Sequence, residues 1–244
     1  MSLPTIVFVH GAGGGAWEWE FWQAVFEERG WQTLSGDLMP NSRGVEFTQV
    51  DDYVEQIIDW IHQVQGDVPP IVVGASMAGP LLLKAIETQP VSAAVLVNSV
   101  PVEGVDGWPQ AKVDFPDVIP WAAKGLAERS LEKMVDYEAS IAALVDQSWR
   151  DESGSVLNAL YLGIAVKQPT CPLLVITGSE DQDIPSELGA NLAHYLAADL
   201  MTFRNVSHLG VLLGHRAELV ANVVCEWVES LEVSLSVSLG DISE

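Results

Sequence analysis

Hydrophobic positions in this chain form short continuous runs that are separated by stretches with a helical period. Continuous apolar runs bounded by turn residues are typical of strands buried on both faces of a parallel sheet. The helical period is clearest over 50–63, where apolar residues recur three and four positions apart. The runs that predict strands are 5–9, 33–38, 71–73, 93–97, 172–177 and 200–203.

This alternation of strands and helices predicts an α/β fold with a mostly parallel, doubly wound sheet of about six strands. Right-handed crossovers place helices on both faces, and functional groups collect at the carboxyl ends of the strands. We assign 1–100 and 170–230 to this core. The stretch 101–169 is too long for one crossover, and we expect a helical cap inserted above the strand ends. Two ordinary peripheral helices are the alternative.

The end of the chain, 231–244, has a different pattern. Leucine and valine alternate with serine and glutamate from Leu231 to Leu239, which predicts a strand with one apolar face. A lone strand is unstable in water, so we expect it to pair with a sheet edge, either its own or that of a second copy in a homodimer. A disordered tail is the alternative.

Composition excludes several classes of protein. The chain has 244 residues, 34 acids against 11 bases and a net charge of −23, so its surface repels nucleic acid and anionic membranes. No apolar run has the length of a membrane span, and no signal peptide is visible. Neither Cys171 nor Cys225 lies in a CxxC motif, which is compatible with a reducing compartment, and we expect a cytoplasmic protein.

The most informative stretch is Ile71–Pro80, with the sequence IVVGASMAGP. A buried strand runs into a tight turn with Ser76 at its apex, and a helix follows. Small residues, Gly74 and Ala78, flank the serine as such a turn requires, and the helix N-terminus offers N–H groups to an anion. The pattern predicts a nucleophile elbow in which Ala78 replaces the second glycine of G-x-S-x-G. A Gly-Ser turn without chemistry is the alternative.

The glycine run that follows the first strand permits a rival interpretation. Residues 11–16, GAGGGA, fit the dinucleotide-binding pattern G-x-G-x-x-A, and Asp37 ends the next strand. None of the four tyrosines has a lysine four positions later, as a short-chain reductase would require. An NAD(P)-binding Rossmann-type oxidoreductase is therefore one alternative, and a non-catalytic ligand-binding protein is another. No HExxH motif or Cys/His cluster indicates a metal.

Four separated motifs occur in a recognisable order: HGAGGGAW, GASMAG, GSEDQDIP and NVSHLG. With them the chain resembles the α/β-hydrolase superfamily over nearly its whole length, in the minimal form without the first two strands of the full sheet. The opening motif is similar to the methylesterase and hydroxynitrile lyase branch. The lyases carry a lysine directly after the catalytic histidine, where this chain has Leu209, so the resemblance favours ester hydrolysis.

The resemblance also implies site residues. The family's order of nucleophile, acid and histidine gives Ser76, Asp181 and His208. Asp181 has the family spacing from the preceding glycine and the following proline, whereas Asp183 is the alternative acid. His208 follows the last predicted strand directly, and His215 is the reserve.

The HG signature at the glycine run implies that the Ala12 N–H is one oxyanion donor, with Gly13 in reserve. The residue after the nucleophile, Met77, supplies the other. These assignments imply a serine hydrolase that cleaves a small to medium, largely apolar carboxylic ester and needs no cofactor. The expected partner is therefore a small-molecule ester.

Overall fold

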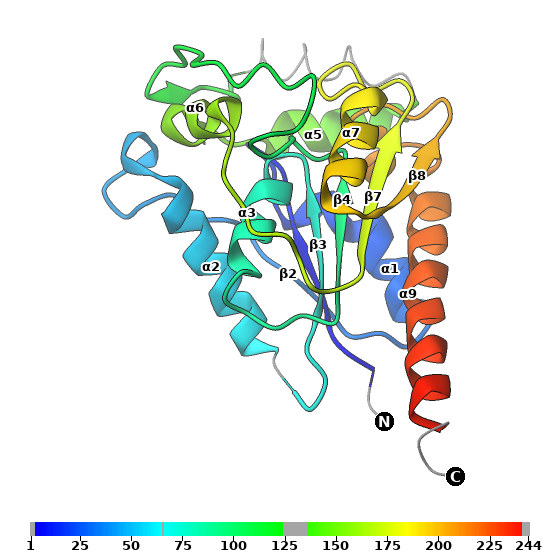
Figure 1. Ribbon diagram of the computed structural model, residues 1–244. Coiled ribbons are helices and arrows are strands. Elements are labelled where there is room, and N and C mark those ends of the chain that lie inside the picture. The colour runs from blue at the N-terminus through cyan, green and yellow to red at the C-terminus, as the bar shows by residue number, and fades with distance from the viewer. Residues whose placement is uncertain (1–2, 65, 124–135, 241–244) are drawn as a thin grey trace.

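The centre of the molecule is a six-stranded sheet in which every neighbouring pair is parallel (Figure 1). The computed structural model describes residues 3–64, 66–123 and 136–240, without the side chains of 232–240. The strand order is β2-β1-β3-β4-β7-β8, which confirms the predicted α/β fold with its mostly parallel sheet. The strands are β1 (Ile6–Val9), β2 (Thr33–Ser35), β3 (Ile71–Ala75), β4 (Ala93–Val97), β7 (Leu173–Gly178) and β8 (Asp199–Phe203).

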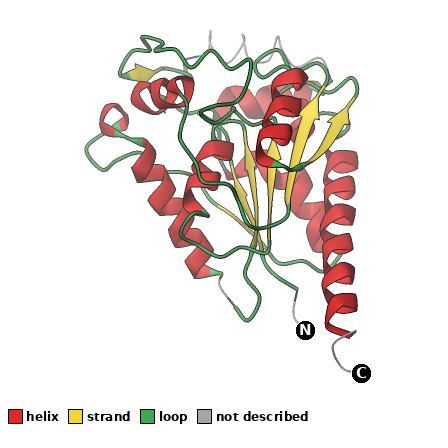
Figure 2. Ribbon diagram, viewed as in Figure 1, coloured by secondary structure: helices red, strands yellow, loops and turns green. Residues whose placement is uncertain are grey.

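Helices cover both faces of the sheet (Figure 2). Successive side chains of a strand point to opposite faces. In β1, Val7 and Val9 accordingly pack with one group of helices, whereas Ile6 and Phe8 pack with the other. The first group is α2 (Val50–Gln63), α3 (Ala78–Ala85) and α7 (Ser186–Leu196). The second is the 3-10 helix η1 (Ala16–Trp19) with α1 (Glu20–Glu28), α8 (Gly210–Leu213) and α9 (Ala217–Gly240).

Much of the described part of the segment between β4 and β7 lies over the carboxyl ends of the strands, at the top of Figure 1. It contains α5 (Ala139–Ser148) and α6 (Gly154–Leu162). It also contains a small antiparallel ribbon of β5 (Val118–Ile119) and β6 (Glu152–Ser153), which the hydrophobic pattern did not predict. Part of the predicted cap, 124–135, lies outside the described residues. A second 3-10 helix, η2 (Val45–Phe47), lies between β2 and α2 in the chain.

The strand predicted for the end of the chain is wrong over 231–240, where helix α9 continues to Gly240. Period-two alternation also places Leu231, Leu235 and Leu239 four positions apart, on one face of a helix. Extending an existing helix fixes one residue per hydrogen bond gained, whereas a new strand needs a partner edge. The pairing of a C-terminal strand therefore loses its basis, and homodimer formation stays a prediction; residues 241–244 lie outside the described part.

No helix in the described ranges is long and apolar enough to cross a membrane.

Candidate active site

Ser76 stands at the turn between β3 and α3, in a left-handed backbone conformation with φ of +52°. A non-glycine residue at positive φ is strained and persists where the surroundings fix it. Here the Ser76 N–H donates to Val97 O at 2.9 Å, and the Ser76 carbonyl accepts from Gly79 N–H and Val100 N–H. The turn is tight because a Cβ on Gly74 would lie 3.1–3.2 Å from Leu82 and Ala78. These contacts hold the Ser76 hydroxyl at the carboxyl end of the sheet.

The two other predicted residues meet this hydroxyl. His208 Nε2 lies 3.0 Å from Ser76 Oγ, and His208 Nδ1 lies 2.7 Å from Asp181 Oδ2. The carboxylate of Asp181 accepts a hydrogen bond from the Nδ1–H group, so Nε2 is left to accept one from the serine hydroxyl. The structure thus joins side chains from three distant parts of the chain in one hydrogen-bonded line.

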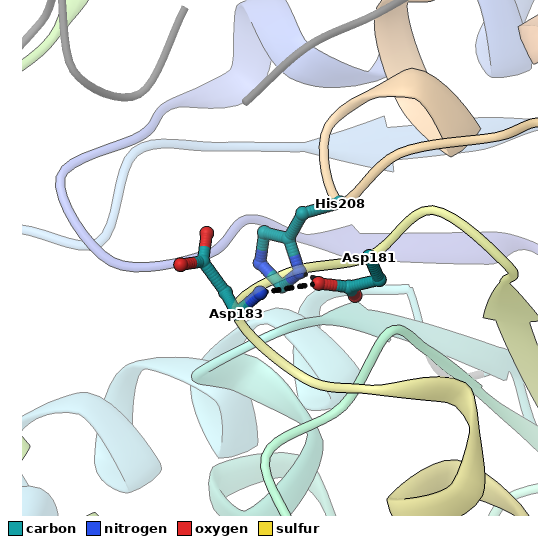
Figure 3. Close-up of side chains that lie close together, drawn as sticks. All are labelled: Asp181, Asp183 and His208. Atoms are coloured by element: carbon teal, nitrogen blue, oxygen red, sulfur yellow. Dashed lines mark hydrogen bonds and ion pairs between the residues drawn. The ribbon is translucent and has the colours of Figure 1, made fainter. Parts of the chain in front are cut away.

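Asp181 and Asp183 play different parts (Figure 3). Asp181 has a fully buried side chain, and its Oδ1 accepts the backbone N–H groups of Asp183 and Ile184 at 2.9 and 2.8 Å. These bonds aim Oδ2 at the imidazole. The Asp183 side chain is exposed and points away from the Asp181 carboxylate. Of the two acids, the structure therefore places Asp181 against His208. His215, the reserve histidine, faces Glu138 on the surface.

Asn98, which follows β4 at φ of +43°, joins the loops that carry the acid and the histidine. Its Oδ1 accepts from Gly178 N–H at 2.8 Å, at the end of β7, and its Nδ2 donates to His208 O at 2.8 Å. The side chain is buried, so both bonds are shielded from water. Asn98 therefore fixes how His208 sits relative to Asp181.

Opposing effects set the pKa of His208. Burial disfavours the charged imidazolium and lowers the pKa, whereas the carboxylate of Asp181 stabilises it. Asp183 and Glu18 add to this stabilisation, and the net result raises the pKa of His208 above its ordinary value of 6.5. The imidazole is therefore a stronger base than a free histidine and must still lose its proton before it can act as one.

Ligand atoms of Asp181, Asp183 and His208 lie within 4.8 Å of one another, and such groups can hold metal ions in proteins (Figure 3). In this group both ring nitrogens of His208 already have partners, Asp181 and Ser76. A metal bound to Nδ1 would displace the Asp181 hydrogen bond. The geometry therefore fits an oriented base better than a metal site.

The loop after β1 brings Ala12, one of the two predicted oxyanion donors, to the serine. A Cβ on Gly11 would lie 3.2 Å from Ser76 Cβ, so the glycine permits the close approach of the two loops. Ala12 and Met77 both line the cavity into which Ser76 and His208 open, and Met77 is the N-cap of α3. Gly13, the reserve donor, is engaged elsewhere, because its N–H donates to Glu152 Oε2 at 3.0 Å.

The segment between β4 and β7 holds this loop from the outside through Arg150 and Glu152. The Arg150 backbone N–H donates to Gly13 O at 2.8 Å, and its guanidinium donates to Gly14 O at 2.9 and 2.6 Å. Glu152, which is buried, accepts from Gly13 N–H through Oε2 and from Tyr53 Oη at 2.7 Å through Oε1. These bonds clamp both sides of the residue next to Ala12 and so fix the direction of the Ala12 N–H.

His10 has a structural part in the same loop. Its Nδ1 lies 2.7 Å from Gly11 O, and its Nε2 accepts from Leu38 N–H at 2.8 Å. These partners require a neutral ring with the proton on Nδ1. Burial is the main cause that lowers the pKa of His10 to about 4, so the ring stays neutral at physiological pH.

Glu18 is an acid that sequence reasoning did not single out. It lies between Trp17 and Trp19, lines the cavity and is only 2% exposed. Its Oε2 accepts from Gly11 N–H at 3.3 Å. Burial raises the pKa of Glu18 to about 7. The cavity thus has a carboxyl group beside the loop after β1 that is about half ionised near neutral pH.

The cavity measures about 440 Å³ and is lined mainly by apolar and aromatic side chains from both the core and the cap. Its aromatic residues are Trp108, Phe115, Trp121, Trp149 and Tyr161. All but Tyr161 belong to loops or helix ends of the cap, where a hydrophobic pattern cannot assign side-chain direction. A cavity of this size and lining suits one small organic molecule next to the serine.

Of the functional residues, sequence reasoning missed Asn98, Tyr53, Arg150 and Glu152 as well as Glu18. Asn98 had a usable signal, because a polar residue directly after a buried strand lies at the functional edge of the sheet. The others are charged or polar residues outside the strands that the hydrophobic pattern predicts, and their roles depend on contacts between segments far apart in sequence.

Comparison with known proteins places these features in a wider context. Residues 6–223 match the model of a family described as the alpha/beta hydrolase family. A search of curated proteins found no match.

Among solved structures, a variant of tomato methylketone synthase I in complex with beta-ketoheptanoate aligns with a TM-score of 0.74 and 16% identity. The alignment covers 95% of this chain and 100% of that one. A polyneuridine aldehyde esterase mutant aligns with a TM-score of 0.72 and 20% identity, over 99% of both chains. A methylesterase from Arabidopsis aligns with a TM-score of 0.67 and 16% identity, over 91% of this chain and 98% of that one. At these identities the structures show a shared fold.

Proposed function

Because this chain belongs to the alpha/beta hydrolase family, we propose that it is a serine hydrolase of carboxylic esters that works through an acyl-enzyme. The observation that carries the proposal is the hydrogen-bonded line from Asp181 through His208 to Ser76. A serine hydroxyl is a weak nucleophile until a base takes its proton, and the base needs an orienting acid. The three residues supply these roles in the order that the family resemblance implies.

In the first half of the reaction, Ser76 Oγ attacks the carbonyl carbon of the ester while its proton moves to His208 Nε2. The electron pair of the carbonyl π bond moves onto oxygen and makes the tetrahedral oxyanion. Asp181 keeps the proton on Nδ1 and stabilises the imidazolium that forms. When the oxyanion collapses, the bond to the alkoxy oxygen breaks, and His208 returns the proton to the departing alcohol.

The backbone N–H groups of Ala12 and Met77 stabilise the oxyanion. One such preorganised donor contributes roughly 3 kcal/mol to lowering the barrier. The N–H of Met77 also lies at the positive end of helix α3. In the second half of the reaction, water attacks the acyl carbon while its proton moves to His208 Nε2. The second oxyanion collapses, the bond from the acyl carbon to Ser76 Oγ breaks, and His208 returns the proton to Ser76 as the acid product leaves.

The lining of the cavity supports a small to medium, largely apolar ester. Two carboxylates on the wall, Glu18 and Asp183, disfavour an anionic substrate by repulsion. An anion such as the beta-ketoheptanoate held by the methylketone synthase structure is therefore a poor fit for this chain. Leu209 after His208 likewise offers no charged group for the chemistry of hydroxynitrile lyases.

The structure disfavours the dinucleotide interpretation of the glycine run. Asp37 Oδ1 accepts from Ala16 N–H at 2.8 Å, so it closes the glycine loop where a ribose would bind. A Cβ on Gly13 would lie 2.7 Å from the Trp121 ring, which occupies the space above the loop. A non-catalytic binding protein would not need the three aligned groups at Ser76.

A panel of p-nitrophenyl esters with acyl chains of increasing length tests this proposal. We expect hydrolysis that is highest for short and medium chains, because the cavity holds about 440 Å³. Ser76→Ala should remove it while the far-ultraviolet circular dichroism spectrum stays the same. Hydrolysis at the parent rate by the variant would contradict the proposal.

A further inference from the structure

Glu18 has less hydrogen bonding than a buried carboxylate normally has. The group is 2% exposed, and its Oε2 accepts a long bond of 3.3 Å from Gly11 N–H. No residue in the described ranges donates to its other oxygen, Oε1. Buried charged oxygens in proteins are normally paired, because each unpaired one has lost its hydration without compensation. Oε1 packs beneath the glycine loop, where a Cβ on Gly14 would clash with it, and the Glu18 side chain lines the cavity with this hydrogen-bond position unfilled.

The position of Glu18 also conflicts with the chemistry proposed for the serine. Gly11, which binds Oε2, directly precedes Ala12, whose N–H is the proposed oxyanion donor. An ionised Glu18 next to a developing oxyanion puts two negative charges in a cavity with mostly apolar walls. Like charges repel strongly in such surroundings, and the repulsion would raise the barrier. A positive charge between them would remove the conflict.

The described part of the cavity wall supplies no lysine or arginine for this purpose. Arg150 is near, but its guanidinium is bound to Gly14 O and Leu38 O and does not line the cavity. Asp183 adds a second carboxylate to the wall, and aromatic rings form much of the rest. Aromatic faces attract cations, so these rings and the two carboxylates favour a positively charged group on the ligand.

We propose that the ester substrate carries a protonated amine near its scissile carbonyl, and that this amine binds the carboxylate of Glu18. The proposal rests on the proposed serine hydrolase activity and names its substrate class. One N–H of the amine donates to the carboxylate, and the positive charge lies close to both Glu18 and the oxyanion. The net charge of −23 on the chain attracts such a substrate over long distances.

Matched ester pairs test the proposal with the purified full chain. Dimethylaminoethyl butyrate and isopentyl butyrate have nearly the same shape and differ in the charge of the alcohol. Methyl beta-alaninate and methyl butyrate make the same comparison on the acyl side. At pH 7.5 and low salt, we expect kcat/KM for the amine to exceed that for its neutral partner by about tenfold or more in at least one pair, as a hydrogen bond to a charged group can provide.

Glu18→Gln keeps the shape of the side chain and removes its charge, so the preference should fall to a ratio near one. The matched control is Glu20→Gln, which removes an exposed carboxylate two positions away and should keep the preference of the parent. The readout is a ratio within one protein, so partial loss of folding does not change it.

Three results overturn the inference while ester hydrolysis stands. These are equal rates within both pairs, an unchanged preference in Glu18→Gln, and an equal preference for hydroxyethyl butyrate, which has a neutral hydroxyl donor. If none of the esters is hydrolysed and Ser76 does not react with a fluorophosphonate, the proposed function fails and the inference fails with it.

Discussion

Replacing Glu18 by glutamine should make the stability of the protein depend differently on pH. Burial raises the pKa of Glu18 from 4.5 in the unfolded chain to about 7 in the fold, so the folded state binds its proton more tightly. Between these values the folded protein holds more protons, and the free energy of unfolding falls as pH rises. The neutral glutamine does not titrate, so the variant escapes this loss.

The size of the effect follows from the two pKa values. A difference of one pKa unit corresponds to about 1.4 kcal/mol, so the shift at Glu18 amounts to about 3 kcal/mol once the group is ionised in both states. The difference in unfolding free energy, variant minus parent, should therefore grow by about 3 kcal/mol from about pH 4.5 to pH 8. His10 has a depressed pKa in both proteins, so its contribution cancels.

Urea denaturation followed by tryptophan fluorescence at several pH values measures this difference, because the chain has nine tryptophans. Glu20→Gln is again the control, because it removes an exposed carboxylate two positions away. A difference for Glu18→Gln that stays constant with pH would refute the reasoning, because it would mean that Glu18 titrates in the fold as it does in water.

Three further outcomes test the site. Asp181→Asn should lower kcat by about four orders of magnitude, because an amide favours the wrong tautomer of His208. Asp183→Asn should change kcat for neutral esters little. The reverse ranking would show that Asp183 orients the base. As pH increases, kcat/KM for a neutral ester should rise with an inflection above pH 6.5, because His208 must be neutral to act as a base. Burial lowers the pKa of His208, but the negative charges around it, Asp181 above all, raise it more. An inflection below pH 6.5 would contradict this order of effects. Tyr53→Phe removes the hydrogen bond to Glu152 and should lower kcat about tenfold with a smaller change in KM, because the loop beside the oxyanion loses one support. An unchanged kcat in a folded variant would show that this hydrogen bond does not help to position the loop.

The parts of the fold that the sequence predicted depend on local patterns. The helix over 50–63 and the strand over 93–97 occur where the apolar period predicted them. The elbow at Ser76 could be recognised because the small residues that its tight turn requires, Gly74 and Ala78, lie two positions away on either side. Motifs of this kind can be interpreted before any long-range contact is known.

The parts that the sequence did not predict depend on contacts between distant segments. Glu18 stands in a Trp-Glu-Trp segment that looks like an exposed helix start, and its burial comes from packing beneath the glycine loop. Glu152 acts through Gly13, which is 139 positions away. At the C-terminus, an alternating pattern was assigned to a strand, but the same residues also fit the face of a helix already under way at Ala217.

The central claim is that Ser76 is the nucleophile, and covalent labelling tests it most directly. The intact mass of the full chain after reaction with a fluorophosphonate should rise by one adduct, and peptide mapping should place the adduct on Ser76. His208→Ala should react far more slowly, because nothing then takes the proton from the hydroxyl. Labelling of Ser76→Ala at the parent rate, or an adduct on another residue, would contradict the account.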